Sequence, residues 1–437
     1  MILSKDTGLI PSVEYQSTEE RRPLSNLKLL MKILRLKGMT VTTFTFQDHG
    51  RELHRTVKPY KNGCRCPQCN RRGRIVASPG VGCSWEDLTL IGSKILLWFA
   101  PREIESPTHG RVQEQTPWAA RYARITYRLE WRIGMLCRSM TQKAAAEILH
   151  MARSTLSDLL HRIPTRTRDG HSLRGLRGMG ADEISYCKGR KFATIVYDLE
   201  RAQVVWVGAG KGRETIDPFF SEALSEYPRS PIRCAGCDMS RAYTEAIKPH
   251  YPNATLIIDH FHVTKVLNEA VDEVRKEQWR AMAGEKRKAL TGLRWLLYRD
   301  TSTRTKGQTR ALNRLRHCSR RIHRAWVLKD EFAQFWGFTH QAAAEKFPRR
   351  RMTSALRSRI PSLRTCVSTL KAHFDNILAF VEHNLTNAVA EELNHTIKIL
   401  KNRASGYPNL DAFTDIIYLV VGGFDIPTHV PSNLRTL

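Results

Sequence analysis

The sequence predicts a mixed α/β protein, and three observations predict this class. Residues 179–209 contain three apolar, β-branched runs in succession, and residues 217–258 alternate between helical and strand patterns. From residue 263 to residue 383 almost every window has helical periodicity. Three strands in a meander, followed by alternating helix and strand, is the element order of a ribonuclease H-like core.

The elements follow in order along the chain. A helical pattern at 27–36 precedes two β-branched runs, 41–46 and 95–100, and a helical region at 118–163 ends at Pro164 and a polar linker. The core strands are predicted at 179–186, 193–199, 204–209, 232–237 and 255–258, with helices at 217–227 and 241–249.

The charge of the chain indicates its class of partner. Lys and Arg number 70 against 42 Asp and Glu in 437 residues, a formal charge of +28. Such an excess attracts polyanions, and nucleic acid is the usual one, although a basic membrane-surface protein or a ribosomal component shares this balance. Residues 1–17 do not resemble a secretory signal, and the longest apolar stretches are shorter than the roughly 20 residues of a membrane helix. We expect no membrane partner.

The cysteines are organised at one place only. Of ten cysteines, Cys64, Cys66 and Cys69 form a cluster, and Cys66-Pro-Gln-Cys69 has the spacing of metal ligands. Scattered cysteines elsewhere suit a reducing cytoplasm. Cys234 and Cys237 also have metal-ligand spacing, but they lie on a predicted strand with apolar neighbours, so we expect them in the core.

Residues 141–160 have the pattern of a helix-turn-helix. Thr141 is expected to cap the first helix, and residues 150–152 supply a short turn. The first helix would bury Ala145, Ile148 and Leu149, and the second Leu156, Leu159 and Leu160. The N-terminal part of a recognition helix reaches base edges, and here it would present Arg153, Ser154, Thr155 and Ser157. An ordinary antiparallel helix pair is the alternative.

Three carboxylates are candidates for a metal site. Asp182 lies on the first core strand, and Asp238 immediately follows the strand at 232–237, so a ribonuclease H-like pairing would bring them to neighbouring strand positions. Glu391 belongs to a polar helical face formed by residues spaced four, three and four apart: Asn387, Glu391, Asn394 and Lys398. Converging carboxylates can hold two divalent ions, and Mg²⁺ suits such oxygen ligands. Each carboxylate alone can also be a solvated surface charge.

Two further acidic residues leave alternatives open. Glu392 directly follows Glu391, so either could be the third carboxylate. Asp259 stands at the end of a predicted strand, where it could bind metal or order the turn that follows.

Several segments together resemble the transposases of the ISL-three (ISL3) group of insertion sequences. They are Asp-Met-Ser-Arg-Ala-Tyr from Asp238, Pro-Asn-Ala from Pro252, Asp-His-Phe-His-Val from Asp259, and Asn387-Ala388 leading to Glu391, Asn394 and Lys398. The resemblance extends from about Leu27 to Phe413. It implies a DDE nuclease with Asp182, Asp238 and Glu391 as its catalytic carboxylates, two Mg²⁺ (or Mn²⁺) ions per site, and an all-helical insertion before Glu391.

The resemblance also implies a structural zinc module at the cysteine cluster. Cys66 and Cys69 would be completed by a second ligand pair further on, but Ser106 stands where a cysteine is expected. His109 could still bind Zn²⁺, with Cys64 or Cys83 as the fourth ligand.

The expected architecture has five parts. They are a β-rich zinc-binding module at 1–112, a helix-turn-helix domain at 113–165, a first part of the ribonuclease H-like core at 175–265, a helical insertion at 266–383, and the last core helices at 384–437. The insertion is very basic between Arg304 and Arg324, a run expected to contact DNA phosphates. Its tryptophans, at 279, 295, 326 and 336, are expected in the core.

The function implied is that of a transposase acting on double-stranded DNA. It would bind the terminal inverted repeats of its element, cleave there, and join the ends to target DNA as a homo-oligomer in the bacterial cytoplasm, at the nucleoid. Asn394 and Lys398 would contact DNA beside the active site. The alternatives are a DNA-binding regulator derived from an inactive transposase, and a structure-selective nuclease of the same fold.

Overall fold

We describe the fold from a computed structural model. It describes residues 39–59, 64–77, 81–90, 92–120, 122–167, 173–187, 191–224, 232–237, 239, 241–258, 260–288, 290–300, 303–383, 388–407 and 409–424. The predicted helix at 27–36, and Asp238, Asp259 and Asn387, lie outside these residues. The chain divides into two compact units, residues 1–167 with 425–437, and residues 168–424.

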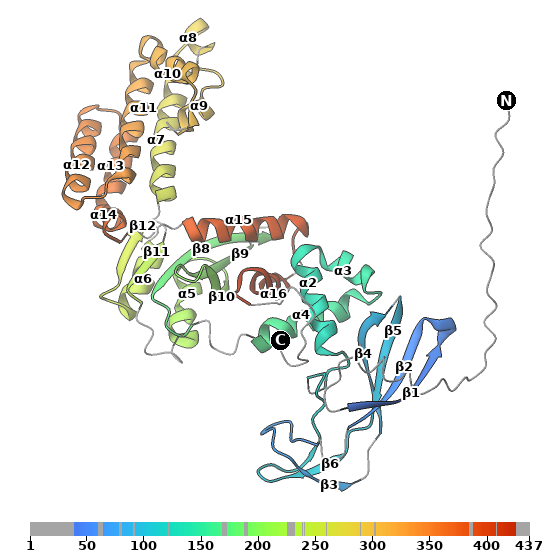
Figure 1. The fold of residues 1–437 in the computed structure, drawn as a ribbon. Helices are drawn as coiled ribbons and strands as arrows, with labels where there is room; N and C mark the ends of the chain where they lie inside the picture. The colour runs from blue at the N-terminus through green and yellow to red at the C-terminus, as the bar shows by residue number, and fades with distance from the viewer. Residues whose placement is uncertain are drawn as a thin grey trace, which may run out of the picture. The chain divides into compact units, whose positions relative to one another are not determined.

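The first unit contains a four-stranded sheet with its own core. The strand order is β1-β2-β5-β4, in which β2 and β5 are parallel and the other pairs antiparallel. Its strands are β1 (Met39–Gln47), β2 (Glu52–Pro59), β4 (Cys83–Leu90) and β5 (Ser93–Phe99) (Figure 1). Trp85, Phe99 and Trp118 pack edge to face or tilted in the core. The strands predicted at 41–46 and 95–100 are confirmed.

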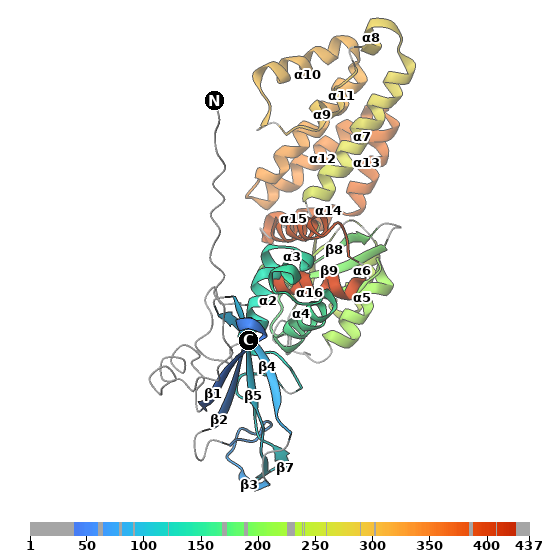
Figure 2. The same ribbon diagram turned by 90° about the vertical axis from the view of Figure 1, so that its right-hand side faces the viewer.

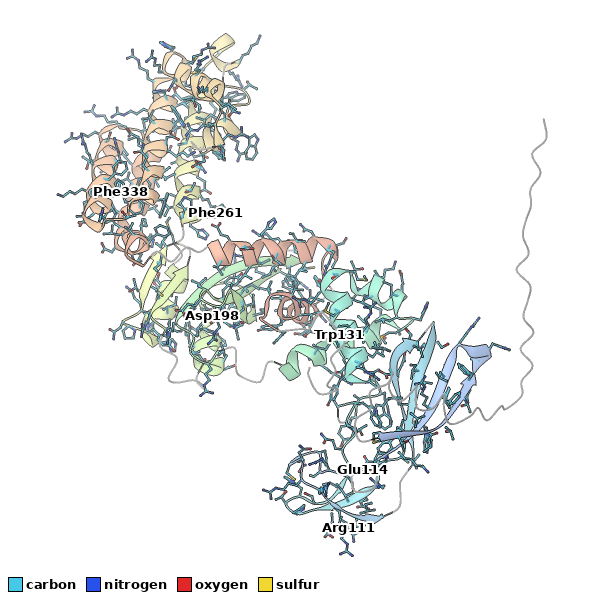
Figure 3. All side chains as sticks on the ribbon, in the orientation of Figure 1. Arg111, Glu114, Trp131, Asp198, Phe261 and Phe338 are labelled. Carbon is cyan, nitrogen blue, oxygen red and sulfur yellow. The ribbon has the colours of Figure 1, made fainter. Side chains whose placement is uncertain are left out.

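A second, smaller sheet carries the cysteine cluster. It consists of β3 (Arg74–Ala77), β6 (Glu103–Ser106) and β7 (Gly110–Gln113), in the order β3-β6-β7. Ile104 is the one buried apolar side chain on these three strands as described. Glu114, labelled in Figure 3, accepts hydrogen bonds from the Arg102 side chain at 2.8 and 2.7 Å, and this ion pair joins the outer ends of β6 and β7.

Three helices are described in the first unit, namely α2 (Tyr127–Ser139), α3 (Gln142–Ile148) and α4 (Arg153–Thr167) (Figure 2). Thr141 caps α3, since its hydroxyl accepts a hydrogen bond from the Ala144 N–H at 3.2 Å. The turn before α4 contains His150 at φ +50°, as a short turn between two helices requires. Leu156, Leu159 and Leu160 are buried as predicted.

Two of the three predicted anchors of α3 differ from the prediction. Ile148 is 53% exposed and Leu149 is only partly buried, and Ala146 is buried beside Ala145 instead. These two small side chains form the contact face of α3, so the face is rotated away from the position that the larger apolar residues had suggested.

The second unit contains a five-stranded sheet in the order β10-β9-β8-β11-β12. The first three strands pair antiparallel, whereas β11 runs parallel to both β8 and β12. They are β8 (Gly178–Cys187), β9 (Lys191–Asp198), β10 (Gln203–Ala209), β11 (Cys234–Cys237) and β12 (Thr255–Ile258). All five predicted core strands are present. Asp198, labelled in Figure 3, orders the β9–β10 turn by accepting from the N–H groups of Glu200 and Arg201.

Helices cover both faces of this sheet. On one face α5 (Arg213–Pro218), the π-helical turn η2 (Phe219–Ala223) and α6 (Arg241–His250) pack against Met179, Ala181 and Val205. The helix predicted at 217–227 therefore begins earlier, after Gly212, where a φ of +87° ends the preceding loop. The other face carries α14 (Phe374–His383), α15 (Ala388–Arg403) and α16 (Leu410–Val421), and Figure 1 shows α15 across β8.

Between β12 and α14 every regular element of the described chain is a helix. The helices are α7 (His260–Ala281), α8 (Gly284–Lys288), α9 (Arg294–Tyr298), α10 (Lys306–Cys318), α11 (Arg320–Phe332), α12 (Gln341–Arg357) and α13 (Pro361–Ala372). They share a core that includes Val271, Leu312, Trp326 and Phe335. None of the helices among the described residues is long and apolar enough to cross a membrane.

Two predictions within this helical region are corrected. Trp295 is 71% exposed and Trp279 is also exposed, because each ring stacks with an arginine at the surface rather than entering the core. Arg304, counted among the basic surface residues, has a side chain that is only 1% exposed and is paired with Asp330.

Candidate active site and DNA-binding surfaces

Asp182 lies in the middle of β8 on the face covered by α15. Side chains alternate along a strand, so Met179 and Ala181 enter the core beneath α5 and α6 while Asp182 points to the opposite face. Its Oδ1 accepts a hydrogen bond from the Glu183 N–H at 2.7 Å, and its Oδ2 accepts one from Asn394 Nδ2 at 2.5 Å. The carboxylate is therefore held between its own strand and α15.

Asn394 is part of the packing between α15 and the sheet. It is only 5% exposed, and its Oδ1 accepts a hydrogen bond from the hydroxyl of Tyr197, which is completely buried on β9. The prediction that Asn394 contacts DNA is therefore wrong, because the residue faces the sheet together with Leu393 and Ile397. The predicted polar face of this helix therefore contains both a buried residue, Asn394, and exposed residues, Glu391 and Lys398.

Glu391 and Lys398 lie one turn before and after Asn394, and both are exposed. At about 100° per residue, Glu391 lies about 60° from Asn394 around the helix axis, whereas Glu392 lies about 160° away. Both carboxylates are exposed, and Glu391 is the nearer of the two, around the helix axis, to Asn394, the residue of α15 that contacts Asp182.

Additional contacts fix α15 and α16 on this face of the sheet. Lys401 donates a hydrogen bond from Nζ to the Ser185 carbonyl at 3.0 Å, and Tyr186 stacks on Phe413 of α16. The helix that carries Glu391 is thus tied to the strand that carries Asp182 at two points along its length.

The second predicted carboxylate, Asp238, lies outside the described residues. The pairing of its strand is described: β11 is parallel to β8 with Gly236 opposite Gly180. Asp182 and Asp238 each follow their paired glycine by two residues in the sequence.

Tyr197 is a site residue that the sequence analysis missed. It stands in an otherwise apolar strand, and a buried tyrosine hydroxyl usually has a hydrogen-bond partner. That signal pointed to a polar neighbour without identifying it.

The cysteine cluster brings together three of its four predicted ligands. The ligand atoms of Cys66, Cys69 and His109 all lie within 4.8 Å of one another, and Cys66 Sγ is 3.7 Å from His109 Nδ1. Cys64 is not part of this group, because its thiol is hydrogen-bonded to the Gly73 carbonyl at 3.6 Å. Cys83 instead contacts the Val81 carbonyl at 3.9 Å.

Hydroxyl groups surround the Cys69 sulfur. Thr108 donates to it at 3.2 Å, and Ser106 Oγ lies 3.6 Å away. The hydrogen bond from Thr108 is the main reason that the pKa of Cys69 falls to about 5, followed by the backbone at Arg71 and the Ser106 hydroxyl. Ser106 thus occupies the side of the cluster where the sequence suggested a missing cysteine.

Helix α4 presents the side chains that were predicted for a recognition helix. Arg153, Ser154 and Thr155 at the N-terminal end of α4 are exposed, and Ser157 is partly exposed. The buried leucines of α4 hold this end outward, so the four side chains remain accessible to a ligand.

Fold and sites together define a mixed α/β protein that combines a helix-turn-helix with a carboxylate-bearing sheet. Comparison with known families identifies it further. Residues 179–417 match the model of the ISL3-type DDE transposases, and residues 114–163 match the helix-turn-helix domain of transposase family ISL3. The chain belongs to the ISL3 family of transposases.

Curated relatives agree with this assignment. The chain is 30% identical over 374 residues to the transposase for insertion sequence element IS1001 of Bordetella parapertussis, covering 84% of this chain and 91% of that protein. It is 25% identical over 384 residues to the transposase for IS1557 of Mycobacterium tuberculosis, covering 82% and 86%. The protein is thus a transposase, its helix-turn-helix indicates DNA binding, and its DDE domain implies the use of divalent metal.

A solved structure also resembles the chain weakly. The Drosophila P element transposase strand transfer complex aligns with a TM-score of 0.40 and 10% identity, over 68% of this chain and 92% of that chain. A TM-score below 0.5 does not establish a shared fold.

Proposed function

We propose that this transposase uses Asp182, Asp238 and Glu391 as its catalytic carboxylates on a ribonuclease H-like core. It would cleave DNA at the terminal inverted repeats of its element and join the freed ends to target DNA. The observation that carries the proposal is the hydrogen bond between Asp182 and Asn394, because it ties the first carboxylate to the helix of the third.

The register of the sheet supports Asp238 as the second carboxylate. The parallel pairing is described up to Gly236 opposite Gly180, and in the sequence Asp238 and Asp182 each follow these glycines by two residues. Adjacent parallel strands lie about 4.8 Å apart, a spacing that suits two carboxylates sharing a metal.

Helix geometry supports Glu391 over Glu392. Glu391 lies about 60° from Asn394 around the axis of α15 and Glu392 about 160°, so Glu391 is the closer of the two to the residue that contacts Asp182. An exposed carboxylate at the border of a buried face can reach a substrate and a metal together.

The chemistry follows from these ligands. Two Mg²⁺ or Mn²⁺ ions bound by the carboxylates would stabilise charge on the attacking and leaving oxygens of an in-line displacement. The three side chains orient that displacement, with water as the nucleophile in cleavage and a 3′-hydroxyl in joining. Oxygen-only ligands fit these hard cations.

DNA recognition is assigned to three groups of side chains. Arg153, Ser154, Thr155 and Ser157 of α4 would read base edges of the terminal repeats in the major groove. Lys398 beside the active site would contact phosphate. The exposed basic side chains of α10 and α11 would do the same: Lys306, Arg310, Arg314, Arg316, Arg320, Arg321 and Arg324. Since two ends must be joined in one reaction, we expect a homo-oligomer on DNA, at the bacterial nucleoid.

We also propose a structural Zn²⁺ at Cys66, Cys69 and His109. A thiolate and an imidazole bound to one tetrahedral zinc lie about 3.6 Å apart, close to the 3.7 Å between Cys66 Sγ and His109 Nδ1. Ser106 occupies the fourth side, so the site has three strong protein ligands.

The test uses the purified full-length protein and labelled DNA that carries the ends of the element. Asp182→Ala, Asp238→Ala and Glu391→Ala are each expected to lower Mg²⁺-dependent cleavage by about a thousandfold or more while DNA binding persists. Glu392→Ala removes the neighbouring exposed carboxylate, about 100° further around α15, and is the matched control that should cleave normally.

Other outcomes would replace the proposal. DNA binding without cleavage by the wild type would indicate a regulator derived from an inactive transposase. Cleavage of branched DNA without joining would indicate a structure-selective nuclease. Loss of activity in Glu392→Ala but not in Glu391→Ala would identify Glu392 as the third catalytic carboxylate.

A further inference from the structure

We propose that Tyr197 and Asn394 are positioning residues that set the orientation of the Asp182 carboxylate. Two hydrogen bonds in series connect them: Tyr197 donates to Asn394 Oδ1, and Asn394 Nδ2 donates to Asp182 Oδ2. The inference rests on the proposed catalytic role of Asp182 and adds two residues that act through it.

The chemistry of the three groups fixes which group donates and which accepts in each of the two hydrogen bonds. An ionised carboxylate only accepts hydrogen bonds, so the amide must turn its NH₂ group toward Asp182. The amide oxygen then faces Tyr197, whose hydroxyl must donate. The amide orientation is therefore determined by its neighbours, and the tyrosine hydroxyl maintains it.

Burial makes this series of two hydrogen bonds rigid. Tyr197 is completely buried and Asn394 nearly so, and hydrogen bonds in such surroundings are stronger and reinforce one another. Reversing the amide would leave its NH₂ group against the tyrosine and its oxygen against a carboxylate. The Asp182 side chain is thus held in one plane, with Oδ1 on the Glu183 N–H and Oδ2 on Asn394.

The same amide also couples two catalytic elements. Asn394 follows Glu391 by three residues on α15, so the bond to Asp182 fixes how that turn of the helix lies over β8. Tyr197 adds β9 to the arrangement. Two neighbouring strands, β8 and β9, and the distant helix α15 are therefore joined by these two hydrogen bonds beneath the carboxylate.

The experiment compares Asn394→Leu and Tyr197→Phe in the full-length protein. Asn402→Leu, an exposed asparagine on the same helix, and Tyr251→Phe, a tyrosine on the opposite face of the sheet, are the matched controls. Two quantities are measured: Mn²⁺ binding, from the electron paramagnetic resonance signal of free Mn²⁺, and the Mg²⁺ concentration that half-saturates DNA cleavage. Asp182→Ala is the reference for loss of the site.

We expect Asn394→Leu to weaken Mn²⁺ binding and raise the half-saturating Mg²⁺ concentration by about 10- to 100-fold, the usual effect of losing a group that orients a metal ligand. Tyr197→Phe removes one oxygen atom and should act in the same direction by a smaller factor, roughly threefold to tenfold. Both controls should match the wild type in both measurements.

Failure of the inference and failure of the proposed function can be distinguished. If Asp182→Ala loses Mn²⁺ binding and cleavage while Asn394→Leu and Tyr197→Phe keep wild-type values, Asp182 is catalytic and the positioning role is wrong. If Asp182→Ala itself cleaves normally, the proposed function is wrong. If Asn394→Leu does not fold, Tyr197→Phe alone decides the inference.

Discussion

The two candidate metal sites of this protein are held in opposite ways. Asp182 lies on a central strand of a five-stranded sheet with helices on both faces, and its partner Asn394 is buried. Cys66, Cys69 and His109 lie beside a three-stranded sheet on whose described strands Ile104 is the one buried apolar side chain.

This difference predicts how each site depends on its ligand. A large apolar core fixes the carboxylate site through packing, so its geometry exists before metal binds. Three short strands with little buried apolar surface have low stability of their own. The Arg102–Glu114 ion pair clamps their ends, and a bound ion would supply the remaining cross-links between the knuckle and the strands.

The largest expected effect comes from removing zinc from the cysteine cluster. Structural zinc contributes on the order of 10 kcal/mol in small zinc-binding peptides, far more than Ile104 can supply. We expect a zinc chelator to open residues 64–77 and 101–113 to proteolysis while residues 83–99 and 173–407 keep their protection. Fragment mapping by mass spectrometry of the chelated full-length protein measures this.

The matched variants are Cys66→Ser and Cys83→Ser. Cys66→Ser should be cleaved in the module without chelator, and Cys83→Ser, outside the cluster, should behave as the wild type. Equal protection with and without zinc would mean that packing alone holds the knuckle, which would remove the contrast between the two sites.

The next effect concerns the packing beneath α15. Leu393→Ala removes a buried side chain next to Asn394 and should lower the free energy of unfolding of the second unit by about 2–5 kcal/mol. Cleavage should fall with it, because α15 can then shift over β8. Urea unfolding followed by circular dichroism measures the loss.

Ile399→Ala on the same helix is the control. Ile399 is half exposed, so its truncation should change the free energy of unfolding by about 0.5 kcal/mol or less. If both variants were equally stable, α15 would not be held by packing.

The same contrast explains what the sequence could predict. Apolar runs such as 193–199 and 204–209 identified every strand of the five-stranded sheet, because burial on both faces leaves a continuous apolar pattern. The cap at Thr141 and the burial of the leucines of α4 could be predicted because capping and helical periodicity are local properties of the sequence. Local rules thus recover the elements and most of their buried faces.

The errors come from tertiary contacts. Asn394 has the spacing of a surface stripe, and only the buried hydroxyl of Tyr197, 197 positions away in the chain, turns it inward. Trp295 has a large apolar side chain of the kind that is usually buried, but its surroundings leave it at the surface. Cys64 lies two residues before Cys66, yet its thiol bonds to Gly73 instead of joining the cluster.

A third prediction extends the role of packing to a buried lysine. Lys329 donates hydrogen bonds to the carbonyls of Leu297 and Tyr298 at 2.7 and 3.1 Å, and burial is the main cause that lowers its pKa from 10.5 to about 8. Between these two values the unfolded chain binds a proton that the folded chain has lost. Stability of the helical region should therefore rise with pH from about 8 to about 10.5.

Lys329→Met isolates this contribution. Between about pH 7 and about pH 9.5 the free energy of unfolding of the wild type should rise by roughly 2 kcal/mol relative to the variant. Urea unfolding of both proteins at the two pH values measures the difference. A constant difference would mean that Lys329 keeps its ordinary pKa and is not held in apolar surroundings.

The smallest expected effect tests the unusual side of the cysteine cluster. Ser106 Oγ lies 3.6 Å from Cys69 Sγ, and a closed structural zinc site has four strong ligands. Ser106→Cys should therefore raise zinc affinity by about tenfold or more, or roughly 1.4 kcal/mol per factor of ten, in competition with a chelating dye. Ser84→Cys, which adds an exposed thiol on β4, should leave the affinity unchanged. If both variants bind zinc as the wild type does, Ser106 is not at the fourth position, and the weakness of this module has its origin in the small sheet alone.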